Sequence, residues 1–192
     1  VPNPSITWEV ANQLDVGLQG GLLDNRLTFE LAYFDYLRTD ILWWRGAAIP
    51  DAAGFSLPRE NIGEVKSWGF DGTIGFGQDI SPDISFQANG NFSFATNEIQ
   101  YWAESPGAPE YQRSTGAPMN TSLYYVADGV FNDQAEIDNN PSWPGARPGD
   151  IRFEDVNGDG EINGLDRIRI DENSTPDVIY GLDLRGSIYD FD

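Results

Sequence analysis

The sequence predicts an all-β protein built from antiparallel strands, and three observations support this fold class. Several segments alternate apolar and polar residues with the period of two that a β-strand imposes. Long helical periodicity is absent. Aromatic residues make up 13% of the chain, and 21 glycines are available for turns. Strands with this alternation present one apolar and one polar face.

The first strand pair is expected at residues 10–20 and 26–42. Even-numbered positions of the first segment and odd-numbered positions of the second are mostly apolar. A short turn at residues 23–26 separates them. The alternation loses its phase at Phe34 and Tyr36, which predicts a bulge or an aromatic girdle there.

A second pair is expected at residues 66–78 and 83–97, and a fifth strand at residues 178–190. Residues 83–97 show the cleanest alternation in the chain. One face of these strands is therefore expected to be apolar and the other polar. The apolar set includes Phe86, Phe92, Phe94, Leu182 and Leu184. The polar set includes Gln87, Asn89, Asn91 and Arg185.

Two architectures explain such alternation, a soluble β-sandwich and a transmembrane β-barrel. Three features favour the barrel. The strands reach the roughly ten residues that a tilted membrane strand needs. Short turns alternate with long loops, expected at about 43–62 and 97–177, and an unstructured loop as long as the second is unusual in a compact domain. Aromatic residues gather near the strand ends. They are Tyr33, Phe34, Tyr36, Trp43, Trp44 and Trp68.

Composition excludes several function classes. The net charge of −20 argues against a nucleic-acid partner. The chain has no Cys and no His, so disulfides, thiol chemistry and histidine catalysis are excluded. The 192 residues lack an initiating Met and stop within a strand-like run, so the chain is expected to be a piece of a longer protein.

One segment has the spacing of an EF-hand-type calcium loop. Oxygen-bearing side chains occupy loop positions 1, 3, 5, 9 and 12, the carbonyl of position 7 is available, and Gly160 stands at position 6. The candidate ligands of a structural Ca²⁺ ion are Asp155, Asn157, Asp159, Glu161, Asn163 and Asp166.

A turn rich in Asp and Asn but without metal explains the same residues. Ile162, at loop position 8, is expected to point inward and anchor the turn. An EF-hand or a dockerin repeat continues as a helix, whereas residues 167–170 alternate polar and apolar side chains and predict a strand. The loop therefore belongs to a β-rich context.

The sequence also contains residue types that enzymes and sugar-binding proteins use. Asp150 and Asp155 are candidates for a glycosidase pair, but with 31 acidic residues such pairs arise by chance, so no enzyme is expected. Trp102 and Trp143 offer apolar ring faces on which sugars stack, and loop packing explains them equally well. A calcium-binding extracellular or dockerin-like adhesion module is the main alternative.

The chain resembles the C-terminal barrel region of SusC-type (RagA/SusC-like) TonB-dependent outer-membrane transporters. The most distinctive segments are PGDIRFEDVNGDG at 148–160 and DGVFNDQAEI at 128–137. Further matching segments lie at residues 8–9, 14–18, 25–27, 33–34, 61–65, 69–70, 180–181 and 189–191. Their order covers nearly the whole chain.

The resemblance implies a bacterial outer-membrane barrel of about 22 strands, with long loops outside the cell and short turns in the periplasm. It implies import of oligosaccharides or peptides together with a SusD-like lipoprotein, driven by the TonB complex. No plug domain or TonB box is recognisable in these residues, and about five strands are too few to close a barrel. The expected partners are the remainder of the same barrel, outer-membrane lipid, the lipoprotein, the TonB complex through an N-terminal part, and a glycan or peptide substrate.

Overall fold

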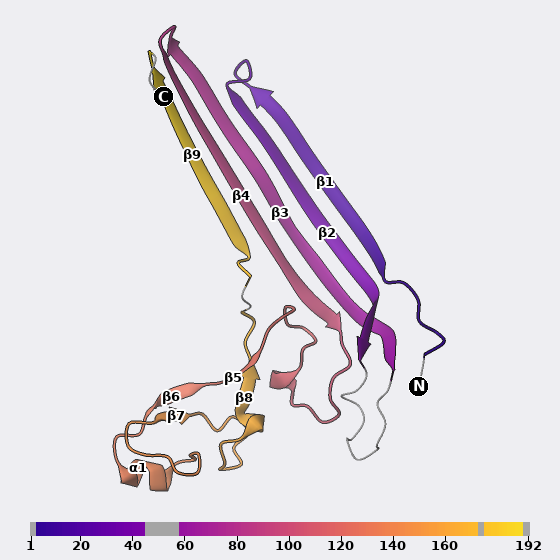
Figure 1. Cartoon of the computed structure of the whole chain (residues 1–192), viewed down its shortest axis with the longest axis vertical. Helices are drawn as coiled ribbons and strands as arrows, with labels where there is room; N and C mark the ends of the chain where they lie inside the picture. The colour runs from indigo at the N-terminus through magenta and orange to yellow at the C-terminus, as the bar shows by residue number, and fades with distance from the viewer. Residues whose placement is uncertain (1–2, 45–57, 173–174, 190–192) are drawn as a thin grey trace.

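Five long strands form one antiparallel sheet in the computed structural model, which describes residues 3–44, 58–172 and 175–189. The sheet order is β1-β2-β3-β4-β9, so four strands follow the chain and the fifth returns after a long excursion (Figure 1). The strands are β1 (Val10–Leu22), β2 (Leu27–Trp44), β3 (Arg59–Ser81), β4 (Ile84–Tyr101) and β9 (Val178–Ile188). Antiparallel strands were predicted at all five places, and this prediction is confirmed.

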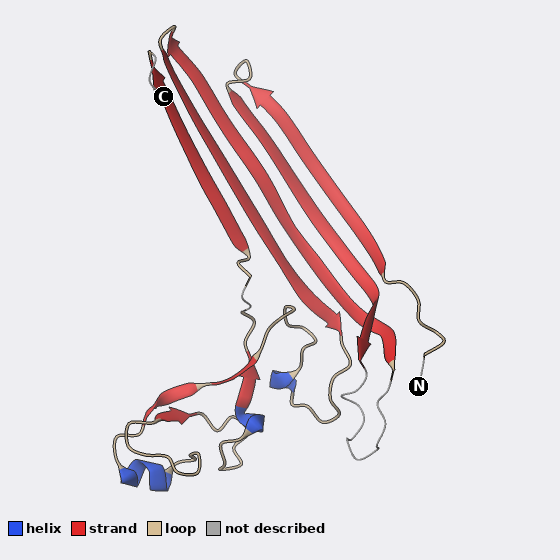
Figure 2. Ribbon diagram, viewed as in Figure 1, coloured by secondary structure: helices blue, strands red, loops and turns tan. Residues whose placement is uncertain are grey.

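The excursion between β4 and β9 is folded, with short elements gathered at one end of the sheet (Figure 2). Two small antiparallel ribbons pair β5 with β8 and β6 with β7. The elements are η3 (Glu110–Gln112), β5 (Leu123–Tyr125), β6 (Ala127–Val130), α1 (Gln134–Asn139), β7 (Ile151–Phe153), η4 (Gly164–Asp166) and β8 (Arg167–Arg169). The loop predicted at about 97–177 begins after Tyr101, where β4 ends, and it contains these short elements before β9 starts at Val178. None of the helices among the described residues is long and apolar enough to cross a membrane.

The strand register separates the sheet into an apolar and a polar face. Directly paired residues point to the same side, and even-numbered residues of β4 pair with even-numbered residues of β3 and β9. On one face Ala88 pairs with Leu184 and Phe92 with Tyr180; on the other Gln87 pairs with Arg185 and Asn89 with Asp183. The predicted division of the apolar and polar sets is confirmed.

The irregularity in β2 lies beyond the predicted position. Pairing of β1 with β2 runs unbroken through Phe34 and Tyr36, and the register with β3 first shifts between Arg38 and Ile41. Of the two alternatives predicted at Phe34 and Tyr36, the bulge is wrong. The two rings lie on the polar face, with centroids 5.1 Å apart, and the space for Phe34 comes from Gly69, where a Cβ would lie 2.7 Å from the ring.

The strands extend further than the alternation indicated. β3 begins at Arg59, seven positions before the expected start at 66, and its first residues pair with the end of β2 up to Trp44. The loop predicted at 43–62 is shorter at both ends, and residues 45–57 lie outside the described part of the chain. Alternation is weak in these outer segments because both faces there carry polar groups.

The apolar face ends at a row of charged and aromatic residues. Lys66 Nζ lies 3.0 Å from Asp35 Oδ2 and 5.8 Å from the ring centroid of Trp68, and the register pairs Lys66 with Glu98. From this row to the tight turns, residues 70–80 of β3 match the roughly 9–11 residues of a tilted membrane strand. The 23-residue β3 therefore projects beyond the apolar band on the side of the long loop.

The sheet is open. β1 and β9 each pair with one neighbour, and no pairing joins them to each other among the described residues. Most large apolar side chains of the sheet are exposed in the isolated chain, as expected for an outer face that meets lipid. The few buried apolar residues lie where the loop meets the sheet or within the loop: Val65, Ile99, Ala117, Phe131 and Ile162.

Candidate functional site

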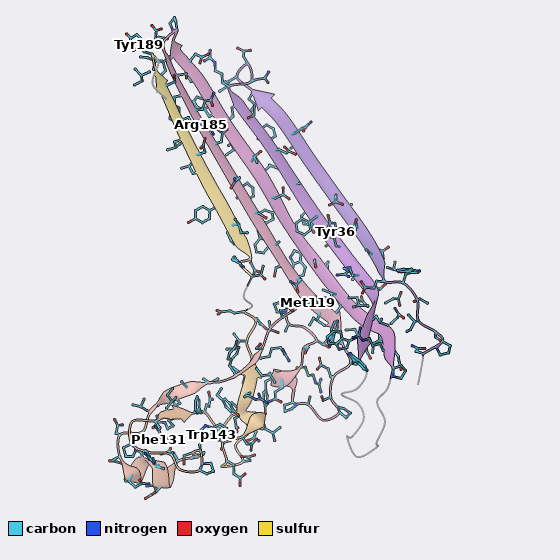
Figure 3. The ribbon with its side chains drawn as sticks, viewed as in Figure 1. Tyr36, Met119, Phe131, Trp143, Arg185 and Tyr189 are labelled. Atoms are coloured by element: carbon cyan, nitrogen blue, oxygen red, sulfur yellow. The ribbon has the colours of Figure 1, made fainter. Side chains whose placement is uncertain are left out.

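The long loop first folds back along the edge of β4. Ile99 donates its N–H to the carbonyl of Ala117 (2.9 Å), and Gly116 donates to the carbonyl of Ile99 (2.8 Å). Met119, labelled in Figure 3, donates its N–H to the side chain of Asn97 (2.7 Å). These bonds occupy part of the β4 edge that β9 does not reach, and so shorten the exposed edge of the sheet.

The two most distinctive sequence segments pack against each other. Phe131 donates its N–H to the carbonyl of Asp150 (2.9 Å) and accepts from Gly149 (2.6 Å). The Arg152 guanidinium donates to the Asp128 carboxylate (3.2 Å) and to the Asp128 carbonyl (2.8 Å). Phe131 is 2% exposed and forms the centre of this part of the loop (Figure 3).

The helix α1 is capped by the residues that precede it. Asp133 accepts the N–H of Glu136 at 2.9 Å, the usual role of an N-cap carboxylate. Glu136 in turn accepts the N–H of Asn132 at 2.8 Å. This backbone hydrogen bond, followed by the Asn132 side-chain amide, lowers the pKa of Glu136.

Asp155 organises the turn in which calcium was predicted. Its Oδ1 accepts the N–H groups of Gly158 (2.8 Å) and Asp159 (3.2 Å), and its Oδ2 accepts the N–H of Gly160 (2.8 Å). Gly158 and Gly160 have φ of 71° and 84°, a region that residues without a Cβ enter freely. The carboxylate therefore closes a sharp turn that depends on these two glycines.

Two asparagine side chains converge on Asp159. Asn157 Nδ2 lies 2.8 Å and Asn163 Nδ2 3.4 Å from Asp159 Oδ2, while Oδ1 accepts the N–H of Glu161 (2.8 Å). The Asn157 amide, followed by the Glu161 N–H, lowers the pKa of Asp159.

The end of the segment is held by a buried carboxylate. Asp166 is fully buried; its Oδ1 accepts the N–H of Val156 (3.0 Å) and its Oδ2 that of Asn163 (2.7 Å). Ile162 is 5% exposed, so the prediction that it points inward is confirmed. The predicted strand at 167–170 is present as β8.

The structure thus brings together Asp155, Asn157, Asp159 and Asn163 by hydrogen bonds within one turn. Glu161 joins them through its backbone, and Asp166 faces backbone N–H groups at the base. No group of three or more His, Cys, Asp or Glu side chains among the described residues is arranged to hold a metal ion. None of the ion pairs in the described part of the chain involves Asp155, Asp159 or Asp166.

Two long side chains connect this turn to the rest of the loop. Gln112 Nε2 donates to the carbonyls of Gly164 (2.9 Å) and Arg167 (2.8 Å). Arg169 donates to the carbonyls of Gln112 (3.0 Å), Arg113 (2.7 Å) and Thr121 (3.0 Å). Gln112 and Arg169 were not among the predicted functional residues. No local sequence signal identifies them, because their partners lie about 50 residues away in the chain.

A cavity of about 470 Å³ lies where this loop meets the end of the sheet. Trp43 from β2 and Trp102, just after β4, line it, with ring centroids 4.2 Å apart. The sequence predicts Trp102 as a residue on which a sugar could stack, and it predicts Trp43 only as an aromatic residue near a strand end. Trp143, the other stacking candidate, packs edge-on against Tyr125 (5.3 Å) and does not line this cavity.

The carboxylates weighed for glycoside hydrolysis serve as turn acceptors. Asp150 accepts the N–H of Arg147 at 2.8 Å, and Asp155 accepts the three N–H groups described above. Their positions are explained by the two turns.

Comparison with known proteins places the chain among outer-membrane receptors. The family described as "TonB dependent receptor-like, beta-barrel" matches residues 1–183. TonB-dependent receptor P3 of Formosa agariphila is 29% identical over 98% of this chain and 20% of its own length. TonB-dependent receptor SusC of Bacteroides thetaiotaomicron is 24% identical over 99% of this chain and 19% of its own.

Solved structures agree on the fold. The RagAB peptide transporter aligns with a TM-score of 0.63 at 21% identity over 98% of this chain and 21% of the solved chain. The RagAB peptide importer in its open-open state gives a TM-score of 0.67 over 97% and 20%.

The chain spans about a fifth of the length of these relatives. The match nevertheless extends from β1 into β9 and includes the whole long loop. An open, two-faced antiparallel sheet is what a section of a large barrel wall should be. The chain belongs to the TonB-dependent receptor-like β-barrel family of the bacterial outer membrane.

Proposed function

We propose that the chain is one wall section of a SusC-like transporter that imports oligosaccharides or peptides across the outer membrane. The observation that carries this proposal is the open five-stranded sheet with one apolar face, joined to a folded loop at one end. An open sheet edge in lipid leaves backbone groups unpaired at several kcal/mol each. The section therefore functions within a barrel whose remaining strands pair with β1 and β9.

The long loops face the outside of the cell in this proposal, and the tight turns face the periplasm. The apolar band adjoins the turns at residues 23–26 and 81–83, whereas the strands extend well past it toward the loop. Barrels of this class have short periplasmic turns and larger external loops. The loop would then stand above the membrane.

This orientation has a direct test in the intact protein. An epitope inserted at Gly145, an exposed turn glycine with nothing near its Cβ position, should bind antibody on whole cells. The same epitope at Asp83 should bind only after the outer membrane is permeabilised. The reversed pattern would contradict the proposed orientation.

The proposed partners follow from family membership. A SusD-like lipoprotein would cover the external face, and the TonB complex would act through a part of the protein outside these residues. RagAB is described as a peptide transporter, so peptides and glycans are both substrate classes for this chain. The alternative, a calcium-binding or dockerin-like adhesion module, has no observation in its favour, because the family match includes the whole long loop.

Partner and transport are tested together. Affinity purification of the intact protein from its own outer membrane should recover a lipoprotein in stoichiometric amount. Deleting the gene should abolish uptake of labelled oligosaccharides or peptides, and restoring it should return uptake. Unchanged uptake in the deletion strain would contradict an import function.

As a second function we propose that the turn at 155–166 binds Ca²⁺. The donors are all oxygen, as calcium prefers, and the carboxylates of Asp155, Asp159 and Asp166 form no ion pair among the described residues. A divalent cation would offset their mutual repulsion. The role would be structural, holding together the loop that faces a partner or substrate.

Calorimetric titration of the intact protein after chelation tests this function. Wild type should bind calcium, whereas Asp155→Ala and Asp159→Ala should weaken binding strongly. Asp171→Ala, an exposed carboxylate close by, is the matched control. Two results would contradict this function: wild type binds no calcium at millimolar concentration, or the Asp155 and Asp159 variants bind calcium with wild-type affinity. In either case the turn is held by its own side chains alone.

A further inference from the structure

We propose that the cavity beside Trp43 and Trp102 binds a sugar ring of a neutral oligosaccharide. This inference rests on the proposed import function and adds a substrate class and a place of contact. The cavity lies at the rim of the sheet, between the ends of β2 and β4 and the base of the folded loop. Cargo that enters or leaves the barrel at its external end would pass this point.

The two indole rings form an angled aromatic wall. Their centroids are 4.2 Å apart and their planes meet at 48°, so they pack against each other and turn other ring surface toward the cavity. Trp43 is 38% exposed, although large apolar side chains usually gain by burial. A sugar ring has a flat face of C–H groups that matches such a surface.

The position of Trp102 is set before any ligand arrives. Its ring lies over Gly63, where a Cβ would approach to 2.9 Å, and Ile41 lies 3.0 Å from the same point. Glycine at this position leaves room for the indole against the sheet. Pre-positioned rigid aromatics lose little conformational entropy on binding.

The polar groups of the cavity suit a neutral ligand rich in hydroxyls. Glu104 Oε1 accepts from Ser114 N (2.7 Å), Thr115 N (2.7 Å) and Thr115 Oγ1 (3.0 Å). These bonds hold the carboxylate in place, and Glu104 lines the cavity. Ser105 and Ser114 also line the cavity, and their hydroxyls both donate and accept.

The cavity is poorly suited to an anionic group. Arg169 is the only cation among the described residues that line it. Its Nε, Nη1 and Nη2 already donate to the carbonyls of Arg113, Thr121 and Gln112. No guanidinium fork is therefore available for the carboxylate of a peptide C-terminus or an acidic sugar.

The experiment measures binding to the intact, detergent-solubilised protein. The probes are hexasaccharides of glucose, xylose and mannose, a uronic-acid hexasaccharide and a mixed peptide pool. Wild type should bind at least one neutral hexasaccharide. Trp43→Ala should weaken that binding on the order of tenfold, and Trp102→Ala at least as much.

Trp143→Ala is the matched control, since Trp143 is a half-exposed tryptophan of the same loop outside the cavity. It should leave binding unchanged. Gly63→Ala provides a variant that keeps both rings but displaces Trp102, and it should also weaken binding. Each variant is first checked on gels for the heat-dependent mobility shift of a folded barrel. Only variants that shift as wild type does are compared for binding, so that misfolding is not mistaken for lost affinity.

Three results would overturn the inference. The first is that wild type binds only peptides or only the acidic probe. The second is that Trp43→Ala binds the sugar with wild-type affinity. The third is that Trp143→Ala loses as much binding as the cavity variants. In each case, loss of uptake in the deletion strain would still support the import function. An inactive transporter and a wrongly assigned cavity are thus distinguishable.

Discussion

The sheet and the long loop of this chain are stabilised in opposite ways. The sheet consists of continuous backbone ladders from β1 to β9, and its large side chains remain exposed in the isolated chain. The loop has short ladders only, yet it contains the fully buried side chains of Asp166 and Phe131 and the buried Ile162. In the proposed barrel the sheet would be completed by lipid and by neighbouring strands, whereas the loop carries its own small core.

The two regions also use polar groups differently. On the polar face of the sheet, Asn, Gln and Asp side chains stand beside one another along the register. In the loop, side chains such as Gln112, Arg152 and Arg169 donate to backbone carbonyls far away in sequence. A loop without long ladders must satisfy its backbone in this way. Perturbations should therefore affect one region without the other.

The largest expected effect is that of Phe131→Ala. Removing a buried aromatic side chain costs about 3–5 kcal/mol, more than a region with so few buried residues can lose without unfolding. Hydrogen exchange should show loss of protection across residues 127–155, with the β1–β4 ladder unchanged. Val130→Ala, a neighbouring half-exposed residue, should have little effect. Equal loss in both variants would contradict a loop core centred on Phe131.

Asp166→Asn is expected to have the next largest effect. An amide offers one oxygen where the carboxylate offers two, so the N–H of Val156 or Asn163 is left without an acceptor, at about 1–3 kcal/mol. Protection should fall in residues 155–170, measured with a chelator present to separate this effect from calcium. Asp171→Asn should change nothing. An unaffected Asp166 variant would show that the buried carboxylate does not hold the turn.

Gly69→Ala tests close packing in the sheet, whereas the two preceding variants test the loop. A Cβ there would lie 2.1 Å from the carbonyl oxygen of Phe94 and 2.7 Å from the Phe34 ring, and overpacking of this kind costs about 1–3 kcal/mol. In this variant the folded band on gels should be lost at a lower temperature than in wild type, and hydrogen exchange in the loop should be unchanged. Gly77→Ala, on the same strand and face with only Gln87 Cγ at 3.9 Å, should match wild type. If the two variants behave alike, close packing at Gly69 does not limit stability.

Acidification should have the smallest effect and should affect the loop. The Asn132 N–H lowers the pKa of Glu136 below the unfolded value of about 4.3. Its contribution is therefore complete above that value and is lost as pH falls through the folded pKa. The protection factors of residues 132–139, corrected for the intrinsic exchange rate, should fall as the pH drops below about 4.3, whereas Glu136→Gln should remove this dependence. A fall in the protection factors at neutral pH would point to another group.

Much of the sheet was predictable because its determinants are local. Alternation in residues 83–97 assigned Phe92 to one face and Asn91 to the other, and the register agrees. The outer part of β3 was missed because each face there mixes apolar and polar residues, and the register shifts after Arg38 and not at Phe34. Phe34 breaks the pattern because Gly69 makes room for its ring on the polar face.

The turn at 155–166 was recognisable from its spacing, and calcium binding there remains a prediction. The sequence by itself determined the strands, their two faces, the glycine-dependent turn and the inward direction of Ile162, because each follows from neighbours a few residues apart. Only the tertiary structure decided that residues 116–117 pair with Ile99, that Gln112 and Arg169 hold the loop together, and that Trp43 meets Trp102. Those contacts join residues about 20 to 60 positions apart, and the entropy of closing such loops varies too weakly with length for sequence alone to select one partner.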